Sequence, residues 1–308
     1  MKNKDIIKSK KREQRIYKLL VSLLIFLIFI LFMVFVPMLV NTIIGIREKD
    51  RLNNNIIRMK EEYGIDIYYA DNISDDVQCK YKLSGDIKTN NDAIDDIYII
   101  MSRLPYDVWL EMTEYNRGEE IYYGRVIIFL CDSIEDTVAG RIEGIENEDG
   151  FSIALKVSNN SNIKTAFAHE LFHRLDTLIN INTWLNYDKE FSYGKWDGTL
   201  PEDYEYLKRV NGNDNKDERK RYTIYGEDDI NNIYFVSTYS QKSREEDMAE
   251  VFSYLLATGV FEDLPEAYNS PHVKEKAKLI VDMIAETFDC VDENAYWTRV
   301  YREKVANN

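Results

Sequence analysis

The sequence has few of the residues that mark disulfide-rich, collagen-like or disordered chains. Its 308 residues include only 3 Cys, 5 Pro and 13 Gly. So little Pro and Gly excludes a collagen-like chain and a long disordered one. Cys79, Cys131 and Cys290 are widely spaced and odd in number, which excludes a disulfide framework and a Cys-rich zinc module. One cysteine pair stays possible, and the sequence leaves open which two would form it.

Outside the N-terminus, positive charges are outnumbered by negative ones. The chain has 39 Lys and Arg against 54 Asp and Glu, a formal net charge of −15. Residues 1–18 hold eight Lys or Arg and two Asp or Glu, and residues 19–46 hold no charge, so the remaining chain carries −21. An acidic main domain predicts no nucleic-acid partner, because phosphates must be met by Lys and Arg.

One long apolar run is present at residues 19–40, interrupted only by Ser22 and Pro37. At about 1.5 Å per residue, a helix of this length crosses the roughly 30 Å hydrocarbon core of a bilayer. The alternative is a cleaved signal peptide, whose apolar core would be only about 7–15 residues long. The run therefore predicts a single-pass membrane anchor. The basic tail 1–18 would stay in the cytoplasm, which puts the main domain on the extracytoplasmic side.

The rest of the chain predicts a polar, helical juxtamembrane stalk at 41–62 and one domain at 63–308. Strand-like segments come early and helix-like segments come late, without regular alternation, which predicts an α+β fold. The segment 180–232 is polar and irregular, as in an insertion or an ordered loop region. The expected strands are 65–70, 125–130 and 151–157, and the expected helices are 91–104, 163–179 and most of the chain after 243.

One motif in this domain carries catalytic chemistry. His169, Glu170 and His173 form an H-E-x-x-H pattern within the expected helix 163–179. Positions i and i+4 share one helix face, so both imidazoles can bind one Zn²⁺, and Glu170 can take a proton from the zinc-activated water. The alternative is a helix with two hydrogen-bonded core histidines and a surface glutamate. Because the chain has only 3 His and two of them fall in the motif, the pattern favours zinc.

A catalytic zinc needs a third protein ligand and an open fourth position. The metzincin pattern would place a third histidine six residues after His173, but that position is Ile179, which excludes that class. His272 and Glu190 are two further candidates. His272 also fits a helix start or surface turn, and Glu190 stands on no clear helical face.

A better candidate for the third ligand lies in the helix expected after Ser243. Glu246 would complete a capping box with Ser243, and this is the purely structural alternative for that glutamate. Glu246 and Glu250 stand one turn apart on the face opposite the apolar one, and their neighbours there are small, namely Ala249, Ser253 and Ala257. Small residues let another helix approach closely. The pattern therefore predicts a buried face with two carboxylates.

At this point the chain resembles a known family. H-E-L-F-H-x-x-D at 169–176, followed by Tyr-x6-Glu-x3-Glu at 239–250, is similar to the anthrax lethal factor-like zinc metallopeptidases, which include the Pro-Pro endopeptidases. The resemblance covers roughly residues 120–260. It implies a zincin-like metallopeptidase domain of the gluzincin type, with a small mixed sheet, an active-site helix and a mostly helical C-terminal part.

The resemblance also implies the roles of individual residues. One Zn²⁺ would be held by three ligands, and the general base would be the glutamate of the motif. A tyrosine would hold the substrate carbonyl or its oxyanion, and two further acids would support the ligand histidines. Residue by residue, the ligands are His169, His173 and Glu246, the base is Glu170, the tyrosine is Tyr239 and the supporting acids are Glu250 and Asp176. Tyr239 could equally be a plain core or loop residue, since the chain has 22 Tyr.

These features together predict a membrane-anchored extracytoplasmic zinc endopeptidase that hydrolyses a peptide or a surface or secreted protein. One alternative is a catalytically inactive relative that binds a peptide or partner, although an intact H-E-x-x-H motif argues against it. A second is a zinc amidase of cell-wall peptides, which Tyr239 with Glu246 disfavours. The alternating strand 151–157 either pairs with an extended substrate by strand addition or is internal to the sheet.

Overall fold

The computed structural model describes residues 2–74, 77–117, 120–134, 139–145, 149–158, 161–185, 193–202, 204–206, 221–227 and 229–307. The chain divides into two units, Met1–Asn53 and Asn54–Asn308.

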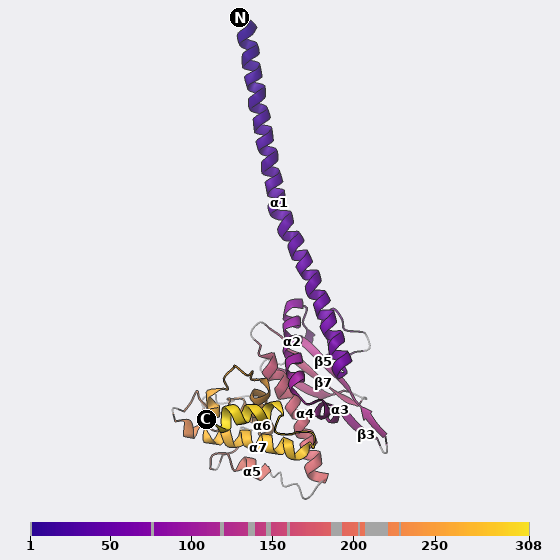
Figure 1. Ribbon diagram of the computed structural model, residues 1–308, viewed down its shortest axis with the longest axis vertical. Coiled ribbons are helices and arrows are strands. Elements are labelled where there is room, and N and C mark those ends of the chain that lie inside the picture. Colours follow the sequence, from indigo (N-terminus) through magenta and orange to yellow (C-terminus); the bar gives the residue numbers. More distant parts are fainter. Residues whose placement is uncertain are drawn as a thin grey trace. The chain divides into compact units, whose positions relative to one another are not determined.

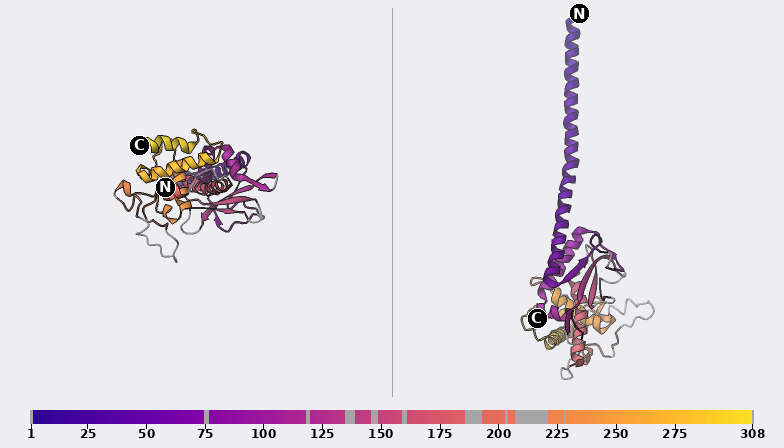
Figure 2. Two further views of the ribbon diagram at one scale, coloured as in Figure 1. Left: turned by 90° about the horizontal axis from the view of Figure 1, so that it is seen from below. Right: turned by 90° about the vertical axis from the view of Figure 1, so that its right-hand side faces the viewer.

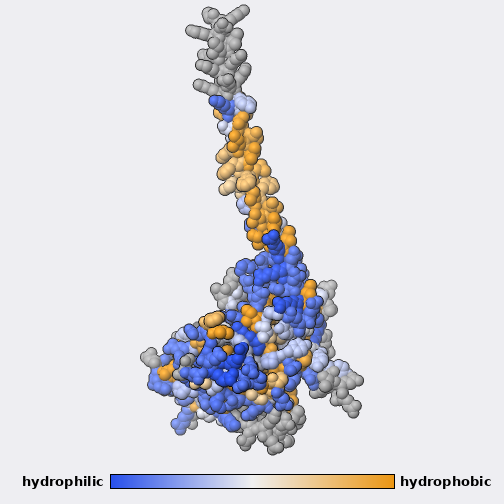
Figure 3. Space-filling view, in the orientation of Figure 1, coloured by the Kyte–Doolittle hydropathy of each residue, from blue (hydrophilic) through white to orange (hydrophobic). Residues whose placement is uncertain are grey.

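The first unit consists of most of one long helix. Helix α1 runs without a break over Lys2–Tyr63 and includes Pro37, so residues 41–62 are helical as expected, and their role as a juxtamembrane stalk stays a prediction. The stretch Ile16–Tyr63 is long and apolar enough to cross a membrane by length and composition, a test that a signal sequence near the N-terminus also passes. Its apolar side chains form a continuous orange band along the helix in Figure 3. Which side of a membrane each end would occupy stays a prediction.

The second unit is built on a small mixed sheet (Figure 1). The path through the sheet is β1-β5-β7-β6, and β2 also pairs with β5. Strands β1, β5 and β7 are parallel, whereas β6 is antiparallel to β7 and β2 is antiparallel to β5. The bounds are Ile65–Tyr68 for β1, Lys82–Leu83 for β2, Arg125–Ser133 for β5, Gly140–Gly144 for β6 and Gly150–Lys156 for β7. A separate hairpin joins β3, Glu114–Arg117, to β4, Glu120–Tyr123.

Helices make up most of the remainder, and the expected α+β class is confirmed. The helix expected at 91–104 begins four residues earlier, because Asp86 caps it by accepting from Thr89 N at 2.6 Å, a polar signal that apolar spacing does not show. The bounds are Ile87–Arg103 for α2, Tyr106–Thr113 for α3, Ile163–Leu185 for α4, Tyr193–Asp197 for α5, Arg244–Ala257 for α6, Pro271–Thr287 for α7 and Tyr296–Tyr301 for α8.

Helix α4 is central to this unit because it packs against the sheet and also against α6. The C-terminal helices, drawn in orange to yellow, lie on one side of α4 and the strands on the other (Figure 2). Phe172 of α4 packs on Phe252 of α6, with ring centroids 5.2 Å apart. Ala249 and Ser253 are fully buried, which confirms that the small-residue face of α6 admits close packing. The motif helix therefore lies in the core.

Strand β7 is internal, which corrects one of the two expectations for it. It pairs with β5 on one side and with β6 on the other. Its backbone hydrogen bonds are used within the sheet, so it cannot accept a substrate strand. Among the described strands, β6 is the neighbour of β7 that lies at the edge of the sheet, with one side unpaired.

Candidate metal centre and active site

The two motif histidines stand on α4 one turn apart, as the i, i+4 spacing predicts. Their Nε2 atoms are 3.2 Å apart, and their rings meet at 79° with centroids 4.9 Å apart. His169 is 6% exposed, so it is held within the helix packing rather than in open solvent. The α4 backbone thus aims two imidazole nitrogens at one point.

Helix α6 brings Glu246 to that same point. The Ser243 hydroxyl caps α6 by accepting from Glu246 N at 3.3 Å, so the cap expected from the sequence is present in the backbone. The Glu246 carboxylate points away from this cap and toward the two histidines. Its Oε2 lies 2.9 Å from His169 Nε2 and 3.6 Å from His173 Nε2. Capping by Ser243 and contact with the histidines are therefore compatible, because they use different atoms of Glu246.

These three side chains fit a zinc ion. Their donor atoms, two imidazole nitrogens and one carboxylate oxygen, all lie within 4.8 Å of one another. Two ligands that each lie about 2.0–2.2 Å from a tetrahedral zinc are about 3.3–3.6 Å apart, close to the separations of 2.9, 3.2 and 3.6 Å found here. Two nitrogens with one oxygen suit Zn²⁺ better than Mg²⁺ or Ca²⁺, which prefer all-oxygen sites.

The electrostatics of the site also favour a cation at its centre. Burial lowers the pKa of His169, but its hydrogen bonds with Glu246 and Glu250 outweigh burial and raise that pKa to about 10. Burial raises the pKa of Glu246, but hydrogen bonds with His169 and His173 outweigh it, and the net pKa is lowered. Carboxylates that favour positive charge on a buried imidazole favour a divalent cation at the same point.

Glu250 lies behind His169, as the resemblance implies. Its Oε1 is 3.0 Å from His169 Nδ1, a contact in which Nδ1–H donates and Nε2 keeps its lone pair for a metal. Its Oε2 accepts a 2.6 Å hydrogen bond from the Ser237 hydroxyl. Ser237 in turn accepts from Tyr239 N at 3.1 Å. Ser237 was not predicted, because a serine in a loop has no periodicity or motif spacing to single it out.

Glu250→Gln is expected to lower zinc affinity by about 10–100-fold, the usual cost of removing a partner that orients a ligand histidine. The amide can present its NH₂ instead of an oxygen to His169 Nδ1, which disfavours the productive ring tautomer. Competition with a fluorescent zinc chelator measures the change. Glu245→Gln, on the exposed side of the same helix, is the matched control. Unchanged affinity in Glu250→Gln would show that His169 is oriented by other contacts.

Tyr239 lies at the site beside Glu246. Its hydroxyl donates to Glu246 Oε1 at 3.0 Å, and its ring lies edge-on to His169 with centroids 5.7 Å apart. Burial raises the pKa of Tyr239, and the charge of Glu246 raises it further, so the hydroxyl stays a protonated donor. The Lys242 ammonium packs over the ring, 3.7 Å from its centroid. Two functions are open to this hydroxyl, namely orienting Glu246 and donating to a substrate oxygen.

Tyr239→Phe separates these two functions. If the hydroxyl donates to an oxyanion, the variant is expected to keep zinc and lose turnover by about 10²–10³-fold, the usual cost of one such donor. Steady-state kcat and zinc affinity are measured on the same preparation. If zinc affinity falls while kcat of the loaded protein is unchanged, the hydroxyl only orients Glu246.

The side chain of Glu170 extends from α4 toward the edge strand β6. It is 6% exposed, and burial raises its pKa, while the backbone N–H of Ile142 hydrogen bonds to the carboxylate. Gly140 makes room for it, since a Cβ there would lie 2.8 Å from Glu170 Cγ and 2.9 Å from Oε1. Gly140 was not predicted, because its importance comes from a helix residue 30 positions further along the chain.

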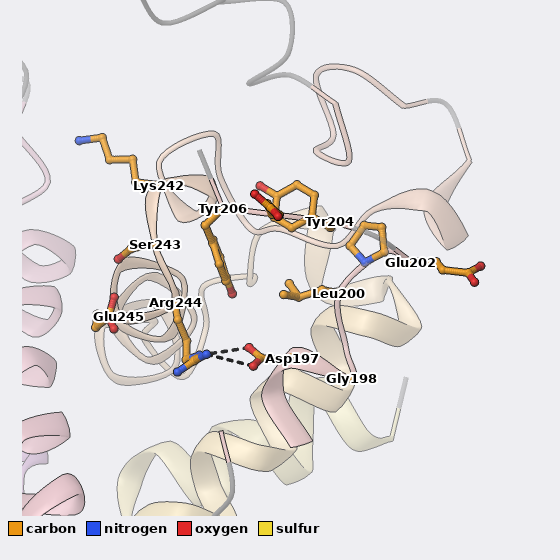
Figure 4. Close-up of a pocket in the computed structure, with 12 residues that line it drawn as sticks. Asp197, Gly198, Leu200, Glu202, Tyr204, Tyr206, Lys242, Ser243, Arg244 and Glu245 are labelled. Atoms are coloured by element: carbon orange, nitrogen blue, oxygen red, sulfur yellow. Dashed lines mark hydrogen bonds and ion pairs between the residues drawn. The ribbon is translucent and has the colours of Figure 1, made fainter. Parts of the chain in front are cut away.

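A cavity of about 200 Å³ opens beside these residues. It is lined by Ala139, Gly140, Asn162, Thr165, Ala166, His169, Glu170, Tyr239 and Glu250. A larger cavity of about 700 Å³ lies between α5, residues 198–202 and 204–206, and the start of α6 (Figure 4). In it Arg244 pairs with both carboxylate oxygens of Asp197, at 3.1 and 2.9 Å. None of the predicted site residues lines this larger cavity, so the smaller one marks the candidate active site.

The other candidates lie elsewhere or are untested. His272 is at the start of α7, where its ring stacks on Tyr234 with centroids 3.8 Å apart and its Nε2 is 3.1 Å from Asn231 O. It is not part of the donor group formed by the other two histidines. Asp176 is buried on α4, and its support of a histidine stays a prediction. Glu190 lies outside the described residues.

Comparisons with known proteins do not assign a family. No protein-family model and no curated protein matches the chain. A solved structure of a candidate zinc-binding metallo-peptidase from Bacteroides caccae is similar with a TM-score of 0.45 and 13% identity, over 84% of this chain and 93% of that one. This similarity is too low to show a family or a function.

Proposed function

We propose that this protein is a membrane-anchored zinc endopeptidase whose catalytic domain, residues 63–308, lies outside the cytoplasm, and that it is related to the lethal factor-like metallopeptidases. One observation carries the proposal. The donor atoms of His169, His173 and Glu246 converge within 4.8 Å, with a buried glutamate adjacent in the motif helix. A third ligand from a different helix is what distinguishes a metal site from two core histidines.

Each residue has a role that follows from its contacts. When bound, zinc supplies Lewis-acid chemistry, which polarises a peptide carbonyl and makes a water more acidic. Glu170 accepts the proton of the attacking water and passes it to the leaving amine, a role that suits a carboxylate whose pKa is raised by burial. Tyr239 donates a hydrogen bond to the oxygen on which negative charge develops. Glu250 holds His169 in the required tautomer.

The edge strand β6 supports an extended peptide as the substrate. Lys156 N donates to Ala139 O at 2.9 Å and Ile145 N to Gly150 O at 3.4 Å, so residues 139 and 145 face β7. In an antiparallel pair the alternate residues 140, 142 and 144 therefore point their N–H and C=O groups away from β7. This is the side on which Glu170 contacts Ile142. A peptide added along this edge would pass close to the metal donors.

The membrane placement is supported by the apolar helix and the basic tail before it. Protease added to intact cells is expected to degrade the domain and to spare the N-terminal tail. N-terminal sequencing of the cell-derived protein separates an anchor from a cleaved signal. Protection of the domain in intact cells would reverse the proposed orientation.

Zinc-dependent cleavage tests the enzymatic proposal. The full chain, purified in detergent, is expected to hold about one zinc by metal analysis and to cleave members of a peptide library. A chelator should abolish cleavage and added zinc should restore it. Bound zinc without cleavage of any peptide would favour the inactive relative. Cleavage confined to cell-wall amides would favour the amidase.

A further inference from the structure

Two of the three cysteines meet on the sheet face opposite the active-site helix. Gly140 and Leu155 are paired residues whose side chains point toward Glu170 of α4. Side chains alternate along a strand, so Ala154 and its neighbours on β5 point to the other face. A second apolar core covers that face. Its buried members are Val77, Ile127, Phe129, Cys131, Ile134 and Ala154, and Cys79 is among the partly buried residues packed against them.

The chain segment that carries Cys79 is brought there by β2. Leu83 of β2 stands opposite Cys131 in an antiparallel pairing, so the residues just before β2 fold over the end of β5. Burial raises the pKa of both thiols, and each thiol also shifts the pKa of the other, so the two lie close together. Cys79 Sγ also lies 3.6 Å from Tyr81 O, and Cys131 Sγ lies 3.6 Å from Phe129 O. All three cysteines are free thiols in this structure.

The two thiols differ in accessibility, which sets the order of any reaction. Cys131 is buried, and burial raises the pKa of its thiol to about 12. Cys79 is half-buried and lines a cavity of about 540 Å³ beside Lys80. Cys290 follows α7, close to Glu111 and Asp289, and does not belong to this core. An incoming oxidant therefore meets Cys79 first.

We propose that Cys79 and Cys131 form an intramolecular disulfide in an oxidising compartment and that Cys290 remains a free thiol. The oxidant is a small or protein disulfide. The Cys79 thiolate attacks one of its sulfurs and releases the first thiol. Cys131 then loses its proton and attacks the Cys79 sulfur of the mixed disulfide, which releases the second thiol. Two electrons pass to the oxidant, whose disulfide becomes two thiols.

The bond would fasten the segment before β2 to the central strand β5. It closes a loop of roughly 50 residues that includes α2 and α3, and closing a loop of this size stabilises a fold chiefly by restricting the unfolded chain. Formation in cells depends on the proposed extracytoplasmic placement. Formation in vitro does not, and neither depends on zinc or on peptide cleavage.

The test uses the full chain purified in detergent under reducing conditions. It is oxidised with excess oxidised glutathione at mildly alkaline pH, the remaining thiols are alkylated, and unreduced peptides are mapped by mass spectrometry. The expected result is one linked pair, Cys79 with Cys131, and alkylated Cys290. Oxidation should also raise Tm by about 5–10 °C, as expected for a disulfide in a domain of this size.

Variants separate the proposed bond from general oxidation. The rise in Tm should persist in Cys290→Ser and vanish in Cys79→Ser, whose half-buried position tolerates serine better than the core position 131. Alkylation of all three cysteines after oxidation, or a link to Cys290, would overturn the proposal. A bond that forms in vitro while acid-quenched cells yield Cys79 and Cys131 reduced would overturn its formation in cells. Zinc content should be equal in Cys79→Ser and the parent. A failure of the disulfide proposal can therefore be told apart from a failure of the proposed metal site.

Discussion

Glu170→Gln is expected to lower kcat for peptide cleavage by about 10²–10⁴-fold while zinc stays bound, because this is what a general base contributes to such reactions. The glutamine keeps the size of the side chain, so its packing beside Gly140 and its contact with Ile142 N–H can persist. What it loses is the ability to accept a proton from the attacking water. The measurements are kcat on the best library peptide and zinc content of the same preparation.

Two comparisons make this result decisive. Glu245→Gln removes one exposed carboxylate from α6 and is expected to leave kcat unchanged. Thermal unfolding of Glu170→Gln should match the parent, which excludes loss of fold as the cause. Retention of parental kcat in a zinc-loaded, folded Glu170→Gln would show that another group takes the proton, and the motif would then lack its proposed base.

Glu246→Gln is expected to weaken zinc binding by more than about 100-fold, beyond the 10–100-fold typical of a residue that only supports a ligand. A neutral amide oxygen is a poor donor to a divalent cation compared with a carboxylate. Glu246 Oε2 also lies 2.9 Å from His169 Nε2, so its charge acts at the centre of the site. His169→Ala should reduce zinc binding at least as strongly. Both affinities are read by competition with a zinc chelator.

The capping-box alternative makes the opposite prediction for the same variant. Gln is accepted three residues after the N-cap, so a glutamate that only caps α6 could be replaced with little loss of stability or zinc affinity. Ser243 already accepts from the backbone N–H at position 246, and that bond survives the substitution. His272→Ala should bind zinc like the parent, since its ring stacks on Tyr234 outside the donor group. Parental zinc affinity in Glu246→Gln with weak affinity in Glu190→Gln would favour Glu190 as the third ligand instead.

Periodic segments were the most predictable part of the fold. The continuous apolar run at 125–130 corresponds to strand β5, and the alternating pattern at 151–157 corresponds to strand β7. The helical spacing of apolar residues at 91–104 corresponds to helix α2. Strand β6 was not predicted. It is only five residues long and includes two glycines, and it forms because β7 offers it an antiparallel partner. Local propensity is weak where pairing supplies the stability.

The site residues likewise divide into those that local spacing predicts and those that only tertiary packing brings together. Two imidazoles meet because they are four residues apart on one helix, which is a local property, so the H-E-x-x-H motif predicted their geometry directly. Glu246 could be nominated because small residues surround its helix face. Its distance to His169 depends on how α4 and α6 pack, and 77 residues separate the two. Ser237 and Gly140 had no local signal, because their relevance comes from a single contact with Glu250 and Glu170.

The sequence by itself determined the apolar helix, the α+β class and the pair of motif histidines, because each follows from residue spacing along one element. Only the tertiary structure decided which carboxylates face the histidines, that β6 rather than β7 is the edge strand beside Glu170, and that Cys79 lies against Cys131 rather than Cys290. These relations join elements far apart in the chain. They are set by the packing of helix on helix and strand on strand, which periodicity within one segment does not contain.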